Sequence, residues 1–210
     1  QSFIPKIGVR IIRDSEQLVS VSSEQLSVLD DLEINPRVVI SGFAGTGKTL
    51  LAQEFARRQE SLGKKVLFLC YNKALAKKIR WGYDRESNVQ VSTFHSFAKR
   101  LIEEKLPGWW ETNKKQTQEF WDEEVPIALM DIAAEEIPKF DVIVVDEGQD
   151  FKSEWFEFIE GLLEDDKNGS LCVFLDEKQD IFKHWSAVPW LDRSTKKILR
   201  KNCRNTRSIV

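Results

Sequence analysis

The strongest indication of a fold in this 210-residue chain is the stretch Gly42-Phe43-Ala44-Gly45-Thr46-Gly47-Lys48-Thr49. It matches the pattern G-x-x-x-x-G-K-[ST] at every fixed position. An apolar run at residues 38–40 precedes it, and a helical pattern at residues 48–61 follows it. Glycines allow the backbone to turn so tightly that its N–H groups point at phosphate oxygens, and the helix adds its positive end. The stretch therefore predicts a phosphate-binding loop rather than a glycine-rich turn that binds nothing.

Each residue of this loop has an expected role in binding a nucleoside triphosphate. Lys48 would reach the β- and γ-phosphates, and the Thr49 hydroxyl would bind Mg²⁺. The other contacts with the nucleotide are assigned to the loop residues Gly42, Ala44, Gly45, Thr46 and Gly47. The expected cofactors are therefore ATP and Mg²⁺.

Strand and helix patterns alternate along the chain. Short, continuously apolar runs are typical of strands buried on both faces, and they occur at residues 38–40, 66–70, 89–91, 142–145, 171–175 and 198–199. Helical patterns lie at residues 24–32, 48–61, 72–81, 94–104 and 154–163. This alternation predicts an α/β fold with a doubly wound, mainly parallel sheet. We expect residues 1–18 to form an N-terminal arm, residues 19–210 the ATP-binding domain, and residues 105–138 a short helical insertion.

Composition restricts the class of protein. The net charge of −3 argues against a chain that holds nucleic acid by bulk charge alone, although it allows a local basic strip. No apolar run approaches the roughly 18 residues that span a membrane. The three cysteines lack the spacing of a metal site and are typical of free thiols in a reducing compartment. We therefore expect a cytoplasmic protein without a membrane partner.

Two carboxylates stand at the end of the apolar run at residues 142–145. Parallel sheets bind ligands at this edge, so Asp146 would hold Mg²⁺ and Glu147 would polarise the attacking water as general base. An Asp-Glu pair alone more often belongs to a solvated loop, but the phosphate-binding loop upstream favours the catalytic interpretation. Gln149 and Asp150 have capping of the next helix as an alternative role.

The chain resembles the UvrD/Rep-like superfamily 1 helicases from about residue 22 to its end. The order of the motifs on one P-loop chain makes the resemblance specific. The sequence Asp-Glu-Gly-Gln-Asp-Phe also resembles the corresponding motif of helicases that carry a nuclease-related domain. Beside the phosphate-binding loop, the similar segments are Ser23-Glu24-Gln25, Tyr71-Asn72-Lys73-Ala74-Leu75-Ala76, Ser92-Thr93-Phe94-His95-Ser96-Phe97, Asp146-Glu147-Gly148-Gln149-Asp150, Leu175-Asp176-Glu177-Lys178-Gln179 and Leu199-Arg200-Lys201-Asn202-Cys203-Arg204.

The resemblance implies a RecA-like P-loop NTPase that couples ATP hydrolysis to movement on single-stranded DNA or RNA. Gln25 would recognise the adenine base, Gln179 would sense the γ-phosphate and Arg204 would act as an arginine finger. Taken alone, His95 is more often a helix-capping core residue, and lysines on a helix are more often solvated. Contacts with nucleic acid would come from Tyr71, Asn72, Lys73, Thr93, His95 and Trp185.

Three features depart from the family pattern. Cys203 stands where the family usually has a tyrosine that stacks on the base, and a thiol cannot stack. After Gln179 the usual aromatic–Arg–Gly run is missing, so a base-stacking role for Trp185 is a hypothesis. The insertion is short, which implies a reduced surface for duplex contacts.

The family's remaining motifs belong to a second RecA-like domain, and none follows Arg204 in this chain. We expect that second domain to be a partner of the catalytic site, and the 210 residues alone to bind nucleotide weakly and turn it over slowly. Two other functions stay open at this point, a P-loop phosphotransferase and a binding module that is switched by nucleotide.

The assigned roles predict different effects for two substitutions. Lys48→Ala should abolish nucleotide binding because it removes the charge that faces the phosphates, whereas Glu147→Gln should retain binding and lose hydrolysis because only the base is gone. Titration with a fluorescent nucleotide and measurement of phosphate release separate the two steps. Normal hydrolysis by Glu147→Gln would show that the general-base assignment is wrong.

Overall fold

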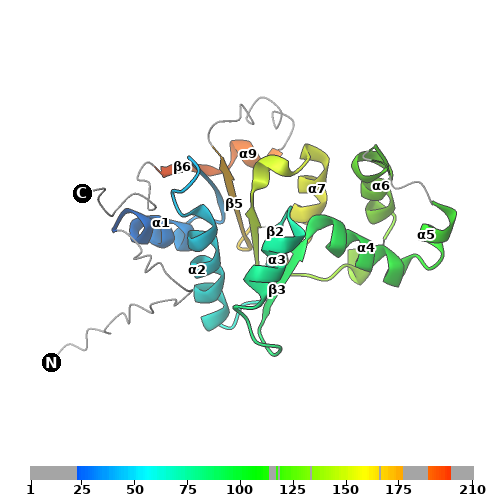
Figure 1. Cartoon of the computed structure of the whole chain (residues 1–210), viewed down its shortest axis with the longest axis horizontal. Helices are drawn as coiled ribbons and strands as arrows, with labels where there is room; N and C mark the ends of the chain where they lie inside the picture. Colours follow the sequence, from blue (N-terminus) through cyan, green and yellow to red (C-terminus); the bar gives the residue numbers. More distant parts are fainter. Residues whose placement is uncertain are drawn as a thin grey trace.

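A wholly parallel sheet of six strands forms the centre of the structure, which is a computed structural model (Figure 1). The strand order is β3-β2-β4-β5-β1-β6. The model describes residues 23–113, 117, 119–132, 134–165, 167–176 and 189–199, so the predicted N-terminal arm lies outside the described residues. The strands are β1 (Arg37–Gly42), β2 (Val66–Cys70), β3 (Val89–Thr93), β4 (Val142–Asp146), β5 (Ser170–Asp176) and β6 (Thr195–Leu199).

The strands coincide with the apolar runs of the sequence, so the predicted parallel sheet is confirmed. Side chains of one strand alternate between the two faces of a sheet. In β4, Ile143 and Val145 belong to the hydrophobic cluster on one face, while Val142 and Val144 belong to the cluster on the other. Both faces are therefore core, which explains why the runs lack polar alternation.

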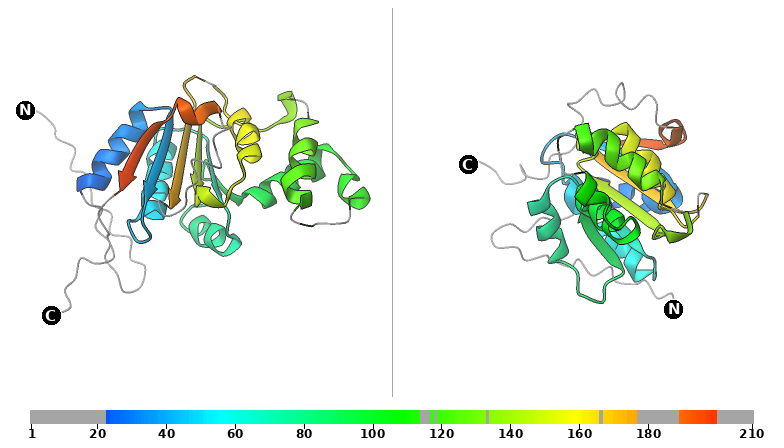
Figure 2. Two further views of the ribbon diagram at one scale, coloured as in Figure 1. Left: turned by 90° about the horizontal axis from the view of Figure 1, so that it is seen from above. Right: turned by 90° about the vertical axis from the view of Figure 1, so that its right-hand side faces the viewer.

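Helices cover the two faces of the sheet, as expected for a doubly wound fold (Figures 1 and 2). One face carries α1 (Ser23–Ile34), α2 (Lys48–Ser61) and α3 (Lys73–Arg80). The other face carries α4 (Phe94–Lys105) and α7 (Ser153–Gly161). A four-residue helix, α9 (Pro189–Asp192), precedes β6. None of these helices is long and apolar enough to cross a membrane.

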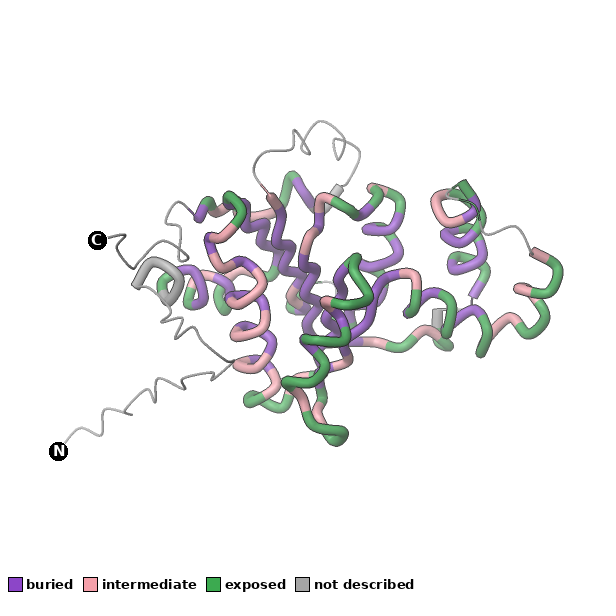
Figure 3. The backbone as a smooth tube through the Cα atoms, viewed as in Figure 1, coloured by how far each residue is buried: buried purple, intermediate pink, exposed green. Residues whose placement is uncertain are grey.

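The segment between α4 and β4 projects beyond the sheet (Figure 2). Its described part contains the short helices α5 (Trp109–Thr112), η1 (Phe120–Glu124), α6 (Val125–Met130) and η2 (Ala134–Glu136). Buried side chains of η1 and α6 join the same core as α4 and α7. The projecting helices keep exposed outer faces, whereas β1, β2 and β4 are buried throughout (Figure 3). The edge strand β6 is more open, with Lys196 and Ile198 exposed.

The register of the strands brings their carboxyl ends to one edge. Gly42 at the end of β1 pairs with Asp176 of β5 and Leu199 of β6. Cys70 at the end of β2 pairs with Asp146 of β4. Sequence segments more than 100 positions apart therefore meet at this edge, which is where parallel sheets bind their ligands.

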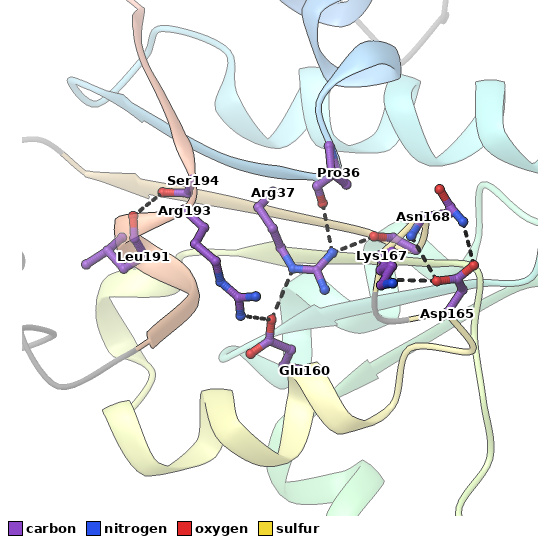
Figure 4. Close-up of polar contacts among 10 residues, drawn as sticks. Pro36, Arg37, Glu160, Asp165, Lys167, Asn168, Leu191, Arg193 and Ser194 are labelled. Carbon is purple, nitrogen blue, oxygen red and sulfur yellow. Dashed lines mark hydrogen bonds and ion pairs between the residues drawn. The ribbon is translucent and has the colours of Figure 1, made fainter.

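A buried ion pair fastens the opposite end of the sheet (Figure 4). The Arg37 guanidinium donates to Glu160 of α7 at 3.2 Å and to the Gly169 carbonyl at 2.5 Å. Arg193 also approaches the same Glu160 carboxylate, at 3.5 Å. One carboxylate thus joins the start of β1, the last turn of α7 and the segment before β6.

Removal of this carboxylate should destabilise the fold. Glu160→Ala removes the carboxylate that accepts from the buried Arg37 guanidinium, so we expect the free energy of unfolding to fall by about 3 kcal/mol. The matched control is Glu103→Ala, because Glu103 pairs with Lys99 at 3.6 Å on the surface of α4. That variant should lose less than about 1 kcal/mol. Urea denaturation measures both, and equal losses would contradict the role of the Arg37 pair.

Candidate nucleotide and nucleic-acid sites

The phosphate-binding loop connects β1 to α2 with the geometry that its glycines require. Gly45 and Gly47 adopt positive φ angles of 88° and 83°, a backbone conformation that other residues rarely take. Gly47 is the N-cap of α2 and offers no side-chain cap, so the first N–H groups of the helix keep their capacity to bind an anion. A Cβ atom at Gly42 would stand 2.8 Å from the Thr46 hydroxyl and 3.0 Å from Leu199, so the loop has no room for a side chain there.

Lys48 and Thr46 are buried and turned toward the loop itself. The Lys48 ammonium donates to the Gly42 carbonyl at 2.7 Å and to the Phe43 carbonyl at 3.2 Å. The Thr46 hydroxyl donates to the same Phe43 carbonyl at 2.9 Å. In this state the lysine charge is satisfied by carbonyl oxygens, which a phosphate with full negative charge would replace favourably. The Thr46 backbone N–H donates to the same Phe43 carbonyl at 3.2 Å, so both groups of Thr46 hold the loop closed.

Asp146 is the most buried charged residue of the site, with 0% of its surface exposed. Neither oxygen of its carboxylate has a partner in hydrogen-bond geometry among the described residues. Burial raises its pKa to about 6; the charge of Glu147 adds to the rise, and the Thr49 hydroxyl and the Lys48 charge oppose it. A buried carboxylate that lacks a partner and lies near a hydroxyl fits a small divalent cation that takes most of its other ligands from phosphates.

Glu147 and Gln149 form a short bridge from β4 to β5. Glu147 has a φ of 55°, the single positive φ of a non-glycine residue in the described ranges. Its carboxylate accepts a hydrogen bond from the Gln149 amide at 2.6 Å, and the Gln149 carbonyl accepts from the Asp176 backbone N–H at 3.0 Å. Gln149 therefore holds the predicted general base and, at the same time, the last residue of β5. Capping of the next helix, the alternative role for Gln149, is not what the amide does here.

The residues predicted to contact nucleic acid follow β2 and β3 at the same edge. Asn72 caps α3, and its side chain accepts from Ala74 N–H at 2.8 Å. Thr93 caps α4 by accepting from Ser96 N–H at 3.1 Å. Lys73 is exposed at the start of α3. The side-chain oxygens of Asn72 and Thr93 are thus engaged in forming helix starts, which positions the neighbouring residues.

His95 lies among aromatic rings rather than alone in the core. Its ring centroid is 5.6 Å from Tyr71, 4.6 Å from Trp121 and 5.0 Å from Trp155. Burial lowers its pKa, Lys73 lowers it further and Asp122 opposes the shift. The imidazole of His95 lies between the exposed Tyr71 and Trp121 of the insertion.

Other predicted site residues have no described side-chain geometry. Gln25 lies in α1, but its side chain is outside what the structure describes. Gln179, Trp185 and Arg204 fall in residues 177–188 and 200–210, which lie outside the described residues, as does Cys203. Sequence reasoning singled out neither Trp121 nor Trp155 as a neighbour of His95, because only the packing of separate helices brings these rings together.

A comparison with known protein families identifies the family of this chain. The family described as Schlafen group 3, DNA/RNA helicase domain, matches residues 36–203. The chain belongs to this family. The prediction of a helicase domain is therefore confirmed, and its assignment to superfamily 1 and to the UvrD/Rep-like branch stays a prediction. No curated protein matches this Schlafen-family helicase domain.

Solved structures of Pif1 helicases are similar to this Schlafen-family domain. One, on DNA unwinding at forked dsDNA by two coordinating Pif1 helicases, has 15% identity and a TM-score of 0.50, over 92% of this chain and 46% of that chain. A Bacteroides Pif1 bound to ssDNA has 16% identity and a TM-score of 0.49, over 89% and 43%. Pif1 from Candida albicans has 18% and 0.48, over 86% and 40%. The chain thus spans less than half the length of these structures, and the likeness concerns the fold.

The raised pKa of Asp146 has a consequence for stability. Its pKa rises from the ordinary 3.8 to about 6 on folding. Between these two pH values, the folded state therefore keeps a proton that the unfolded state has released. The stabilisation is complete below pH 4 and is lost as the pH rises through 6. Relative to Asp146→Asn, which does not titrate, the wild type should lose about 3 kcal/mol between pH 4 and pH 7.

Urea unfolding at a series of pH values, without nucleotide or Mg²⁺, measures this difference. Substitution of an exposed carboxylate, Asp84→Asn, serves as the control and should reproduce the wild-type profile. Parallel profiles for wild type and Asp146→Asn would show that the Asp146 carboxylate is ionised throughout.

Proposed function

We propose that this domain binds and hydrolyses ATP with Mg²⁺ and couples hydrolysis to movement on single-stranded DNA or RNA. The observation that carries the proposal is the buried, unpartnered carboxylate of Asp146 beside the lysine of the phosphate-binding loop. A buried charge without a partner costs several kcal/mol, and an ATP-bound cation is the ligand that would compensate it.

The residues of the loop would bind the triphosphate. Lys48 would exchange its two carbonyl partners for the β- and γ-phosphates, and the N–H groups at the start of α2 would hold phosphate oxygens. Thr49 and Asp146 would hold Mg²⁺, which neutralises charge on the phosphates when it is bound. Gln25 of α1 would contact the adenine base.

Glu147 would accept a proton from the attacking water as general base. Its carboxylate is held by the Gln149 amide, so the orientation of the base depends on the end of β5. Gln179 follows β5 in the sequence, and we assign it the role of sensing the γ-phosphate. Arg204 would approach the same phosphate, and a second RecA-like domain would complete the site.

The single strand would cross the carboxyl edge of the sheet. Tyr71, Asn72 and Lys73 follow β2 there, and Thr93 and His95 follow β3. Trp185 would add a stacking surface. The Bacteroides Pif1 structure contains ssDNA, and the family description includes DNA and RNA, which supports nucleic acid as the partner.

Hydrolysis of ATP with and without single-stranded oligonucleotides tests this function. We expect single-stranded DNA or RNA to stimulate phosphate release severalfold, and Glu147→Gln to abolish both the basal and the stimulated rate. Stimulation by a small-molecule acceptor instead would support a phosphotransferase. Tight nucleotide binding without turnover under any condition would support a nucleotide-switched module, and either result would overturn the motor.

A further inference from the structure

The insertion between α4 and β4 contains a groove that none of the predicted site residues lines. We call it the insertion groove; its volume is about 560 Å³. It belongs to the part of the chain that projects beyond the sheet (Figure 2). Residues of α5 form one wall, and residues of η1 and of the segment before it form the other. The lining residues are Glu111, Thr112, Asn113, Thr117, Glu119, Phe120, Glu123 and Glu124.

Packing inside the insertion holds the two walls of the groove in place. The ring of Phe120 in η1 lies 5.4 Å from the ring of Trp109 and 5.7 Å from that of Trp110, both in α5. Phe120 is also buried in the core that α4 and α7 share. Two positions further along η1, the Asp122 carboxylate pairs with Lys152 at 3.2 Å, next to the start of α7. A groove with fixed walls loses little entropy when it binds a ligand.

The charge of the insertion groove is negative. Four of its lining residues are glutamates, and among the described residues no lysine or arginine lines the groove or pairs with these carboxylates. Phosphate groups would be repelled, so this surface does not suit nucleic acid. The carboxylates are also spread out, because the described residues contain no group of three acidic, histidine or cysteine side chains that could hold a metal ion. The charge pattern fits a ligand whose positive charges are distributed along a chain.

The η1 wall continues into α6, which has an exposed apolar face. Ile127 has 58% of its surface exposed and Met130 has 55%. Glu124, Ile127 and Met130 follow one another at intervals of three residues, so they lie on the same side of the helix. On the opposite side, Val125 and Leu129 are completely buried in the core. Exposed large apolar side chains beside a groove are typical of surfaces that contact another protein.

We propose that the insertion groove docks a basic segment of a partner protein. Lysine or arginine side chains of that segment pair with Glu119, Glu123 and Glu124, and an apolar side chain covers Ile127 and Met130. Charge complementarity selects this occupant, because an anionic lipid surface or a nucleic acid would meet like charge, and a small polar cation would leave the apolar face in water. The inference goes beyond the proposed function, since the partner is a protein and the groove contains no residue of the nucleotide site.

The probe for this test is a fluorescein-labelled peptide of four Lys-Lys-Leu repeats, and its affinity for the 210-residue chain is measured by fluorescence anisotropy. A peptide of four Lys-Lys-Ser repeats keeps the charge and lacks the apolar side chains, so it should bind about fivefold more weakly. A peptide of four Glu-Glu-Leu repeats should not bind, because its charge is repelled. Equal affinity for all three peptides, or no binding of the Lys-Lys-Leu peptide, would overturn the proposal.

Two double variants with the same change of net charge locate the binding site. Glu119→Lys with Glu123→Lys should weaken binding of the Lys-Lys-Leu peptide about tenfold or more, because two ion pairs are lost and two repulsions are added. Glu135→Lys with Glu136→Lys is the matched control, because these exposed residues of η2 belong to the same insertion and do not line the groove. The control should stay within about twofold of the wild type. Equal losses in the two variants would assign the binding to bulk charge and contradict the site.

The apolar contact has a variant of its own. Ile127→Ser with Met130→Ser should reduce the affinity for the Lys-Lys-Leu peptide to that for the Lys-Lys-Ser peptide, and should leave the latter affinity unchanged. Both side chains are exposed, so the melting temperature should stay that of the wild type, which confirms that the variant is folded. A parallel loss of affinity for both peptides would show that the α6 face makes no apolar contact with the ligand.

Two further measurements test the other occupants of the groove. Sedimentation of the wild type alone should show no self-association that Glu119→Lys with Glu123→Lys abolishes; such an association would make the occupant a second copy of this chain and overturn the partner. The same double variant should bind a labelled oligothymidylate at least as tightly as the wild type does. Weaker binding of the oligonucleotide would place the groove on a nucleic-acid path instead. Absence of ATP hydrolysis in the wild type would overturn the proposed function and would not affect the docking of the peptide.

Discussion

Among the described residues, neither oxygen of the buried Asp146 carboxylate has a partner in hydrogen-bond geometry, and the rest of the candidate nucleotide site is arranged around this carboxylate. β4 lies between β2 and β5 with helices on both faces, so its last residue cannot reach water. Lys48 is the nearest cation that could compensate it, yet its ammonium bonds to the carbonyls of its own loop. Both charges are therefore prepared for a ligand that carries phosphates and a metal ion.

A second consequence of the parallel sheet is that a single side chain, Gln149, joins the Glu147 carboxylate to the neighbouring strand β5. Gln149 contacts the Glu147 carboxylate and the Asp176 backbone N–H through the two ends of one amide. A shift of the β5 end relative to β4 would therefore reorient the Glu147 carboxylate, to which we assign the role of general base. Glu147 already adopts a left-handed backbone conformation, which costs of order 1 kcal/mol and is retained where the surrounding contacts enforce it.

Aromatic packing connects the nucleic-acid side of the sheet to the insertion. Tyr71 at the end of β2 approaches His95, and His95 packs against Trp121 of η1. Trp121 in turn contacts Trp110 of α5. Such rings interact over specific geometries, so a base that displaces Tyr71 would change the environment of the insertion through two intervening contacts.

The sequence alone determined the phosphate-binding loop, the strands and the carboxylates Asp146 and Glu147, because glycine geometry and apolar runs act over a few neighbouring residues. The contacts between these residues were decided by the tertiary structure, which pairs strands and packs helices that are far apart in the sequence. The hydrogen bond from the Asp176 N–H to Gln149 joins residues 27 positions apart, and the two tryptophan rings against His95 come from η1 and α7. The raised pKa of Asp146 depends on its burial between β2 and β5, and the sequence around Asp146 does not show that these strands are its neighbours.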